Sequence, residues 1–161
     1  MTGHWRLLLL ITASCLAGAC GGGGTPVPTS PSAQPSFLTG TWAGTLSIER
    51  EGEPTSSGAA TWTFEPVAGT NLQTFAVTIR SQNPWLPMTA TVTSAITPSN
   101  QPPARISTTG SYPSPRGCTG TLLSVGTADR SSIDADFSGV DCASLAQSTF
   151  RGHVVLSKTG S

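Results

Sequence analysis

Charged side chains are scarce in this chain of 161 residues, and their signs cancel. Only 10% of the residues are Asp, Glu, Lys or Arg, with 8 basic and 8 acidic side chains, whereas about 25% is typical of soluble domains. No cluster of Lys and Arg is available to neutralise several phosphates, which excludes a basic nucleic-acid-binding protein. The low charge also disfavours a soluble cytosolic enzyme.

The sequence also lacks the features of a helical protein. Ala, Glu, Lys and Leu do not dominate as they do in coiled coils and bundles, and no window of twelve residues has a convincing period of 3.6. Serine and threonine are abundant instead, with 21 and 24 residues, beside 18 glycines and 13 prolines. Threonine is β-branched and tolerates water on one side, so this composition favours an all-β fold.

The apolar run near the start is too short and too rich in small residues to span a bilayer. It extends from Leu7 to about Ala19 and follows Arg6, which is typical of a signal peptide over residues 1–19. An ordinary secretory signal that is cleaved near Ala19 is one interpretation.

The second interpretation is lipidation, because Leu16-Ala17-Gly18-Ala19-Cys20 resembles the lipobox of bacterial lipoproteins. This resemblance implies that Cys20 carries a diacylglycerol thioether and an amide-linked acyl chain, which together anchor the protein to a membrane. Cys15 is the alternative acceptor. Gly21 replaces the aspartate that marks inner-membrane retention, so the resemblance implies an exported protein on the outer membrane, with the face left open. Residues 20–36 are rich in Gly, Pro, Ser and Thr and predict a flexible tether.

From residue 37 to residue 161 the chain alternates between apolar and polar residues, with turn residues about every ten positions. This pattern predicts one domain of about eight antiparallel strands. The sequential strands and short connections favour an up-and-down β-barrel, with a small β-sandwich as the alternative. The residues expected to face inward include Trp42, Gly44, Leu46, Ile48, Trp62, Phe64, Phe75, Phe137, Phe150, Gly152, Val154 and Leu156.

The first predicted strand opens with Gly40-x-Trp42, which resembles the calycin group, the lipocalins and avidins. The resemblance implies that Trp42 closes one end of a barrel and that a late arginine, Arg151, packs over it. Gly44 stands where avidins place an asparagine that contacts biotin, so the avidin ligand site is not implied.

Two cysteines, Cys118 and Cys142, lie in the predicted domain, and an exported pair is expected to form a disulfide. Their spacing matches neither a CxxC motif nor a zinc site, and no metal or cofactor is indicated.

No catalytic residues are expected either. The sequence contains no G-x-S-x-G motif whose serine His153 could activate as a nucleophile, so His153 is interpreted as a surface histidine. Asp134 and Asp136 alternate with inward residues and, with Asp141 nearby, are interpreted as a solvated face of the barrel.

Aromatic residues are the remaining candidates for binding. Trp42, Trp62, Phe64, Phe75 and Phe137 share the inward parity and either fill the barrel or line a ligand pocket. Trp85 lies in Asn83-Pro84-Trp85-Leu86-Pro87, where it forms a binding tip or folds over the barrel mouth. Residues 112–117 predict a second loop.

Three functions follow in order of preference. The first is a non-enzymatic, lipid-anchored envelope module that binds a small apolar molecule or an envelope partner. The second is an inhibitor or assembly lipoprotein that acts by protein–protein contact through the loops at Pro84–Pro87 and Tyr112–Arg116. The third is an envelope hydrolase, for which the sequence offers no catalytic pair.

Overall fold

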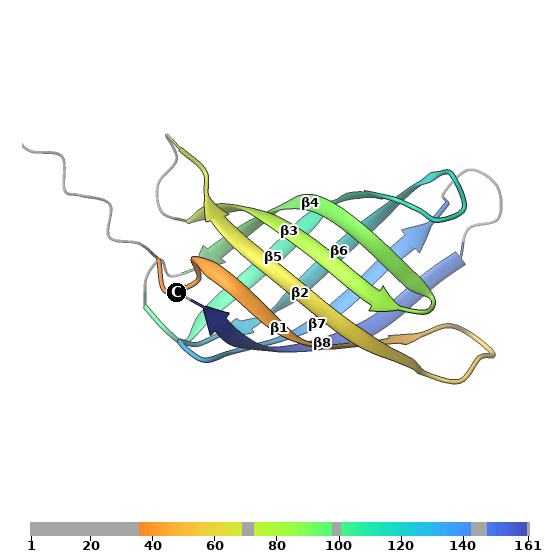
Figure 1. The fold of residues 1–161 in the computed structure, drawn as a ribbon, viewed down its shortest axis with the longest axis horizontal. Helices are drawn as coiled ribbons and strands as arrows, with labels where there is room; N and C mark the ends of the chain where they lie inside the picture. The colour runs from red at the N-terminus through yellow and green to blue at the C-terminus, as the bar shows by residue number, and fades with distance from the viewer. Residues whose placement is uncertain (1–35, 69–72, 98–100, 143–147, 161) are drawn as a thin grey trace, which may run out of the picture. The chain divides into compact units, whose positions relative to one another are not determined.

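Eight β-strands form where alternating apolar residues were predicted. The computed structural model describes residues 36–68, 73–97, 101–142 and 148–160. The strands are β1 (Gly40–Glu49), β2 (Ser56–Pro66), β3 (Thr74–Asn83), β4 (Leu86–Thr97), β5 (Ala104–Pro113), β6 (Thr119–Ala128), β7 (Ser132–Asp141) and β8 (Ser148–Gly160). Figure 1 shows them as a series of antiparallel strands that run obliquely to the long axis of the barrel.

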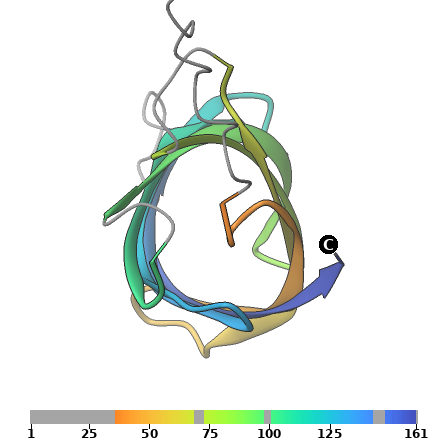
Figure 2. The ribbon, with the colours of Figure 1, turned by 90° about the vertical axis from the view of Figure 1, so that its left-hand side faces the viewer.

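The strands pair in sequence order, and β8 pairs with β1, so the sheet closes into an up-and-down barrel. The ring of strands is visible in Figure 2. The structure therefore confirms the predicted barrel over the sandwich. Closure leaves no edge strand with unpaired peptide groups.

The register places the predicted inward residues on one surface of the closed sheet. Trp42 on β1 is opposite Trp62 on β2, which is opposite Ile79 on β3. Along β4, every second residue from Leu86 to Ile96 is buried and the residues between them are exposed. Gly44 is an exception to its predicted inward position, since it is exposed.

The core fills the inside of the barrel. Trp42, Trp62, Phe64 and Phe75 have no solvent-accessible surface, and Phe137 and Phe150 retain 2% each. Phe64 and Phe75 meet edge to face, with ring centroids 6.1 Å apart, a geometry that aromatic pairs favour.

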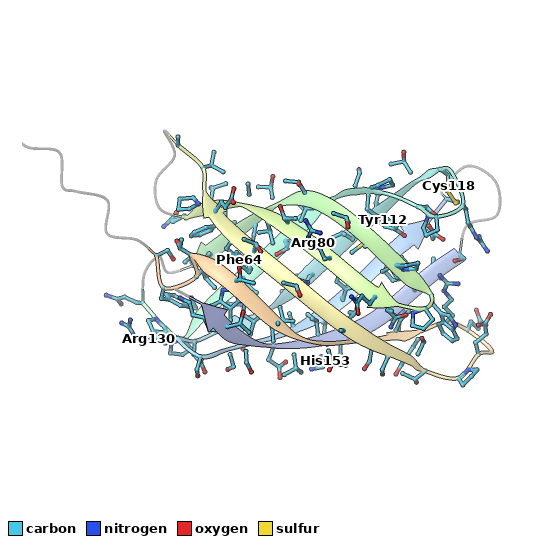
Figure 3. The ribbon with its side chains drawn as sticks, in the orientation of Figure 1. Phe64, Arg80, Tyr112, Cys118, Arg130 and His153 are labelled. Atoms are coloured by element: carbon cyan, nitrogen blue, oxygen red, sulfur yellow. A yellow bond between two sulfur atoms is a disulfide. The ribbon has the colours of Figure 1, made fainter. Side chains whose placement is uncertain are left out.

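The barrel has two different ends. The described chain enters at one end through residues 36–39, and β8 finishes there. Here Leu38 is fully buried, and its carbonyl oxygen accepts a hydrogen bond from Trp42 Nε1 at 2.8 Å. The opposite end carries the connections β1–β2, β3–β4 and β5–β6, and Figure 3 shows Tyr112 and Cys118 near it and Arg130 at the entry end.

The predicted signal peptide of residues 1–19, Cys20 and the tether up to residue 35 lie outside the described residues. No helix long and apolar enough to cross a bilayer is present within the described ranges.

Candidate functional site

The candidate site is a groove of about 200 Å³ at the end of the barrel opposite residues 36–39. The two loops that the sequence singled out, β3–β4 and β5–β6, lie on either side of it, together with the end of β1. The groove is lined by Arg50, Pro84, Trp85, Pro87, Pro115, Arg116 and Asp141. The structure thus brings together residues that are up to 91 positions apart in sequence, as the separation of Arg50 and Asp141 shows.

Trp85 is held in place by a buried asparagine. Asn83 is fully buried, and its Oδ1 accepts the backbone N–H of Trp85 at 2.9 Å. Its Nδ2 donates to the carbonyl oxygens of Leu46 at 3.1 Å and Ser56 at 2.9 Å. These bonds join the β3–β4 turn to β1 and β2, so the Trp85 backbone is fixed before any ligand arrives. From the sequence, Asn83 was expected only to be part of a turn.

The Trp85 ring is half-buried and packs against the core below it. The guanidinium carbon of Arg50 lies 5.5 Å from the ring centroid, in cation–π geometry. Arg50 Nη2 also donates to the Trp85 carbonyl oxygen at 2.8 Å, while its buried Nε has no hydrogen-bond partner in the described ranges. Arg50 thus covers one side of Trp85 and keeps one N–H without a partner.

Asp141 forms part of the opposite wall, and it does not lie with Asp134 and Asp136 on the outer face, close to which it was expected. Only 3% of Asp141 is exposed. Its Oδ1 accepts the hydroxyl proton of Tyr112 at 3.1 Å, and its Oδ2 lies 3.9 Å from Arg116 Nε. Burial, and then the nearby Asp141 carboxylate, raise the pKa of Tyr112. Asp141 ends β7 on the inward parity, opposite to that of Asp134 and Asp136.

A disulfide closes the same wall. Cys118 and Cys142 are bonded, with Cα atoms 5.3 Å apart and a sequence separation of 24, as the sequence predicted. The bridge ties the start of β6 to the residue after β7, beside Ser114. The sulfurs and the Asp141 carboxylate lie within 4.8 Å of one another. Because both sulfurs are bonded to each other, they are not thiolates, and thiolate is the form of cysteine that binds metals.

The five inward aromatic candidates lie away from this groove. Trp42, Trp62, Phe64 and Phe75 have no accessible surface, and Phe137 has 2%. A water-sized void beside a side chain would give it accessible surface, so these rings are packed on all sides. A ligand inside the barrel would have to displace side chains from a close-packed core.

The cation over Trp42 is not the one that the calycin resemblance implied. Lys158 Nζ lies 5.3 Å from the Trp42 ring centroid and donates to the Phe37 carbonyl oxygen at 2.7 Å. The β1–β8 register sets Lys158 opposite Trp42, and it sets Arg151 opposite Glu49 near the other end of β1. Arg151 is exposed on the outer wall, so the expectation for Arg151 was wrong.

His153 meets two carboxylates on the outer wall. Its Nδ1 is 3.2 Å from Asp136 and its Nε2 is 3.3 Å from Asp134. Both aspartate side chains are exposed, as predicted, with 63% for Asp134 and 91% for Asp136. A catalytic histidine needs one ring nitrogen free to reach a nucleophile, and here both face carboxylates in water. This geometry does not support a hydrolase.

Comparison with protein-family models, with curated proteins and with solved structures found no match in any of the three.

Proposed function

We propose that this protein is a non-enzymatic, lipid-anchored module of the cell envelope that binds another envelope protein through the groove beside Trp85. The observation that carries the proposal is the convergence of Trp85, Arg50 and three prolines on one barrel end. Tryptophan and arginine are the residue types most often responsible for binding energy at protein interfaces. Proline restricts the loops and reduces the entropy that binding would cost.

The rigid support of this groove favours a protein partner. Asn83 holds the Trp85 turn through hydrogen bonds to β1 and β2, and the Cys118–Cys142 bridge holds the facing loop. A preorganised surface of this kind loses little conformational freedom on association. A small apolar ligand inside the barrel is less well supported, since the inward aromatic side chains have almost no accessible surface.

Anchoring through Cys20 fits this arrangement. The described chain enters the barrel at residues 36–39, at the end opposite the β3–β4 connection (Figure 1). A tether over residues 20–36 that leads from an acylated Cys20 would therefore reach the entry end. The groove beside Trp85 lies at the end away from this attachment point, so anchoring would leave it free for an envelope protein.

Site-specific photo-cross-linking in the host envelope tests the proposal. A benzophenone amino acid in place of Pro87, which lines the groove, is expected to give one discrete adduct with an envelope protein. The same probe at Thr91, exposed on the outer surface of the same strand, is the matched control and is expected to give none. Trp85→Ala should weaken the contact about 30-fold, because a central tryptophan typically contributes at least ~2 kcal/mol.

The proposal is overturned if the Pro87 probe captures no protein, or the same proteins as the Thr91 probe. Capture of glycan or of a co-purifying small molecule would equally overturn it. Thermal unfolding of Trp85→Ala and Trp85→Phe separates loss of binding from loss of folding: the phenylalanine variant should fold and retain an intermediate cross-linking yield.

A further inference from the structure

The groove beside Trp85 presents more positive than negative charge to a ligand. Arg50 and Arg116 both line it, and the carboxylate in the lining is that of Asp141. The Asp141 side chain is 4% exposed, whereas that of Arg116 is 54% exposed. Both arginine charges also act on one hydroxyl group: burial, and then Asp141, raise the pKa of Tyr112, and the two arginines oppose this rise. The two guanidinium groups therefore lie near one another, above a carboxylate that is nearly closed off from solvent.

The guanidinium group of Arg116 is only weakly engaged within the chain. Its Nε lies 3.9 Å from Asp141 Oδ2, which is longer than a hydrogen bond. Asp141 instead accepts a hydrogen bond from the Tyr112 hydroxyl. The Arg116 side chain donates no hydrogen bond within the described ranges. An exposed guanidinium group with unused N–H donors can hold a carboxylate through two parallel hydrogen bonds.

Arg50 also keeps a donor for a ligand. Its Nη2 donates to the Trp85 carbonyl oxygen, while its Nη1 makes no hydrogen bond to any described residue. Glu49 and Glu51 are exposed, do not line the groove and form no ion pair with Arg50 in the part of the chain that the structure describes. Because Arg50 lies over the Trp85 ring, an anion bound to Arg50 would lie beside an aromatic surface.

The backbone of the two loops narrows the source of that carboxylate. Carboxylates at chain termini are commonly held by backbone N–H groups. Among the residues that line the groove, Pro84, Pro87 and Pro115 have no N–H group. The N–H groups of Trp85 and Arg116 are already bonded, to Asn83 Oδ1 and Ser114 Oγ. The donors left on the loops are guanidinium groups, which favours an acidic side chain over a chain terminus.

We propose that the groove binds an Asp or Glu side chain of the partner protein. The carboxylate lies between Arg50 and Arg116, and an apolar side chain next to it in the partner packs on Trp85. This inference rests on the proposed function and adds the chemistry of the partner. One carboxylate between two guanidinium groups offsets the excess of positive charge, whereas a basic segment would meet charges of its own sign.

Cross-linking from Pro87 in the host envelope, combined with changes of Arg116, tests this inference. Arg116→Gln is expected to lower the adduct yield about tenfold, a loss typical of a hydrogen bond to a charged group. Arg116→Lys keeps the charge without the planar fork and should give an intermediate yield. Arg130→Gln is the matched control, since it removes the same charge from an exposed arginine at the entry end (Figure 3), and it should leave the yield unchanged.

The adduct also identifies the carboxylate. Mass spectrometry of the cross-linked peptide should find an Asp or Glu beside the labelled residue of the partner. Neutralising it, as Asn or Gln, should lower the yield about as much as Arg116→Gln, and the two changes together should lower it no further, because they remove the same contact. A role of Arg116 in folding alone would make the two losses multiply. Unfolding curves of each variant establish that folded proteins are compared.

Two kinds of failure are distinguishable. If the Pro87 probe captures no protein, the proposed function is overturned, and this inference with it. The inference alone is overturned if the adduct forms equally well with Arg116→Gln, if the captured peptide is a chain terminus without an acidic side chain, or if the losses multiply.

Discussion

Single polar residues hold the ends of this barrel together. Asn83 takes part in three hydrogen bonds that link its turn to β1 and β2, and Asp129 stabilises the β6–β7 turn in a similar way. Asp129 Oδ1 accepts the backbone N–H groups of Ser131 and Ser132, both at 2.7 Å. These bonds are of the Asx-turn type, in which a carboxylate replaces a backbone carbonyl.

At this residue scale, Asp129→Asn is expected to destabilise the protein at neutral pH and not at pH 2. The backbone hydrogen bonds from Ser131 and Ser132 lower the pKa of Asp129 from 3.8 to about 2. A carboxyl whose pKa is lower in the folded state stabilises that state above the unfolded pKa and loses this effect as the pH falls through the folded pKa. The gap between the unfolding free energies of wild type and variant should therefore close between about pH 4 and pH 2.

Urea unfolding at a series of pH values measures this gap. A difference that stays constant down to pH 2 would show that the Asp129 carboxylate does not act through its charge.

Whole strands were largely predictable, because alternation determines which face of a strand is buried. Trp62 and Phe64 were expected inside and are inside. The expectation for Arg151 came from the calycin resemblance, and it failed because the β1–β8 register sets Lys158 opposite Trp42 and Arg151 opposite Glu49. Asp141 shares the inward parity of β7, but its partner Tyr112 comes from another strand and could not be predicted from alternation.

The candidate groove was predictable in its parts and not as a whole. Pro84 and Trp85 in one loop, and residues 112–117 in another, are recognisable as turns with unusual aromatic content. Their proximity follows from closure of the barrel, which no local pattern encodes. Nothing in the sequence indicated that Arg50 would line the groove, apart from its position at the end of a predicted strand.

At the scale of a strand, Gly44→Ala is expected to be strongly destabilising. A Cβ on Gly44 would overlap the carbonyl oxygen of Val155 on the neighbouring strand, so the backbone of β1 or β8 would have to move. Forced overlap in a packed structure typically costs about 1–3 kcal/mol. Gly160→Ala is the matched control, since nothing lies within 4 Å of a Cβ at that position.

Chemical denaturation of both variants is the measurement. Equal losses of unfolding free energy in the two variants would contradict this explanation. They would mean that the loss of glycine flexibility, and not the close approach of β8 to β1, destabilises Gly44→Ala.

At the scale of the whole domain, one covalent bridge among the described residues stabilises the end where the candidate groove lies. Removal of the bridge in Cys118→Ala/Cys142→Ala is expected to lower the free energy of unfolding by about 3 kcal/mol, from the entropy that the open loop regains in the unfolded chain. The loop spans 24 positions. The double variant should also give a lower yield of the Pro87 adduct than Gly44→Ala does at an equal loss of unfolding free energy. The reason is that the bridge holds one wall of the groove.

Cys20→Ala is the control for this measurement. It removes a cysteine without touching the bridge, so the unfolding free energy should not change, while the protein should leave the membrane fraction. A fall in the unfolding free energy on Cys20→Ala would contradict the assignment of Cys20 as an acylation site without a role in the folded domain.

The seam between β1 and β8 connects the first and last strands, as in the bond from Lys158 to the Phe37 carbonyl, 121 positions away. Contacts this distant in sequence form late, since the intervening chain must be ordered first. Until β8 has been synthesised, β1 has only one neighbouring strand and exposes a row of peptide groups. The ring is completed only with the last strand, so a chain truncated within β8 would keep an open sheet that is prone to aggregate.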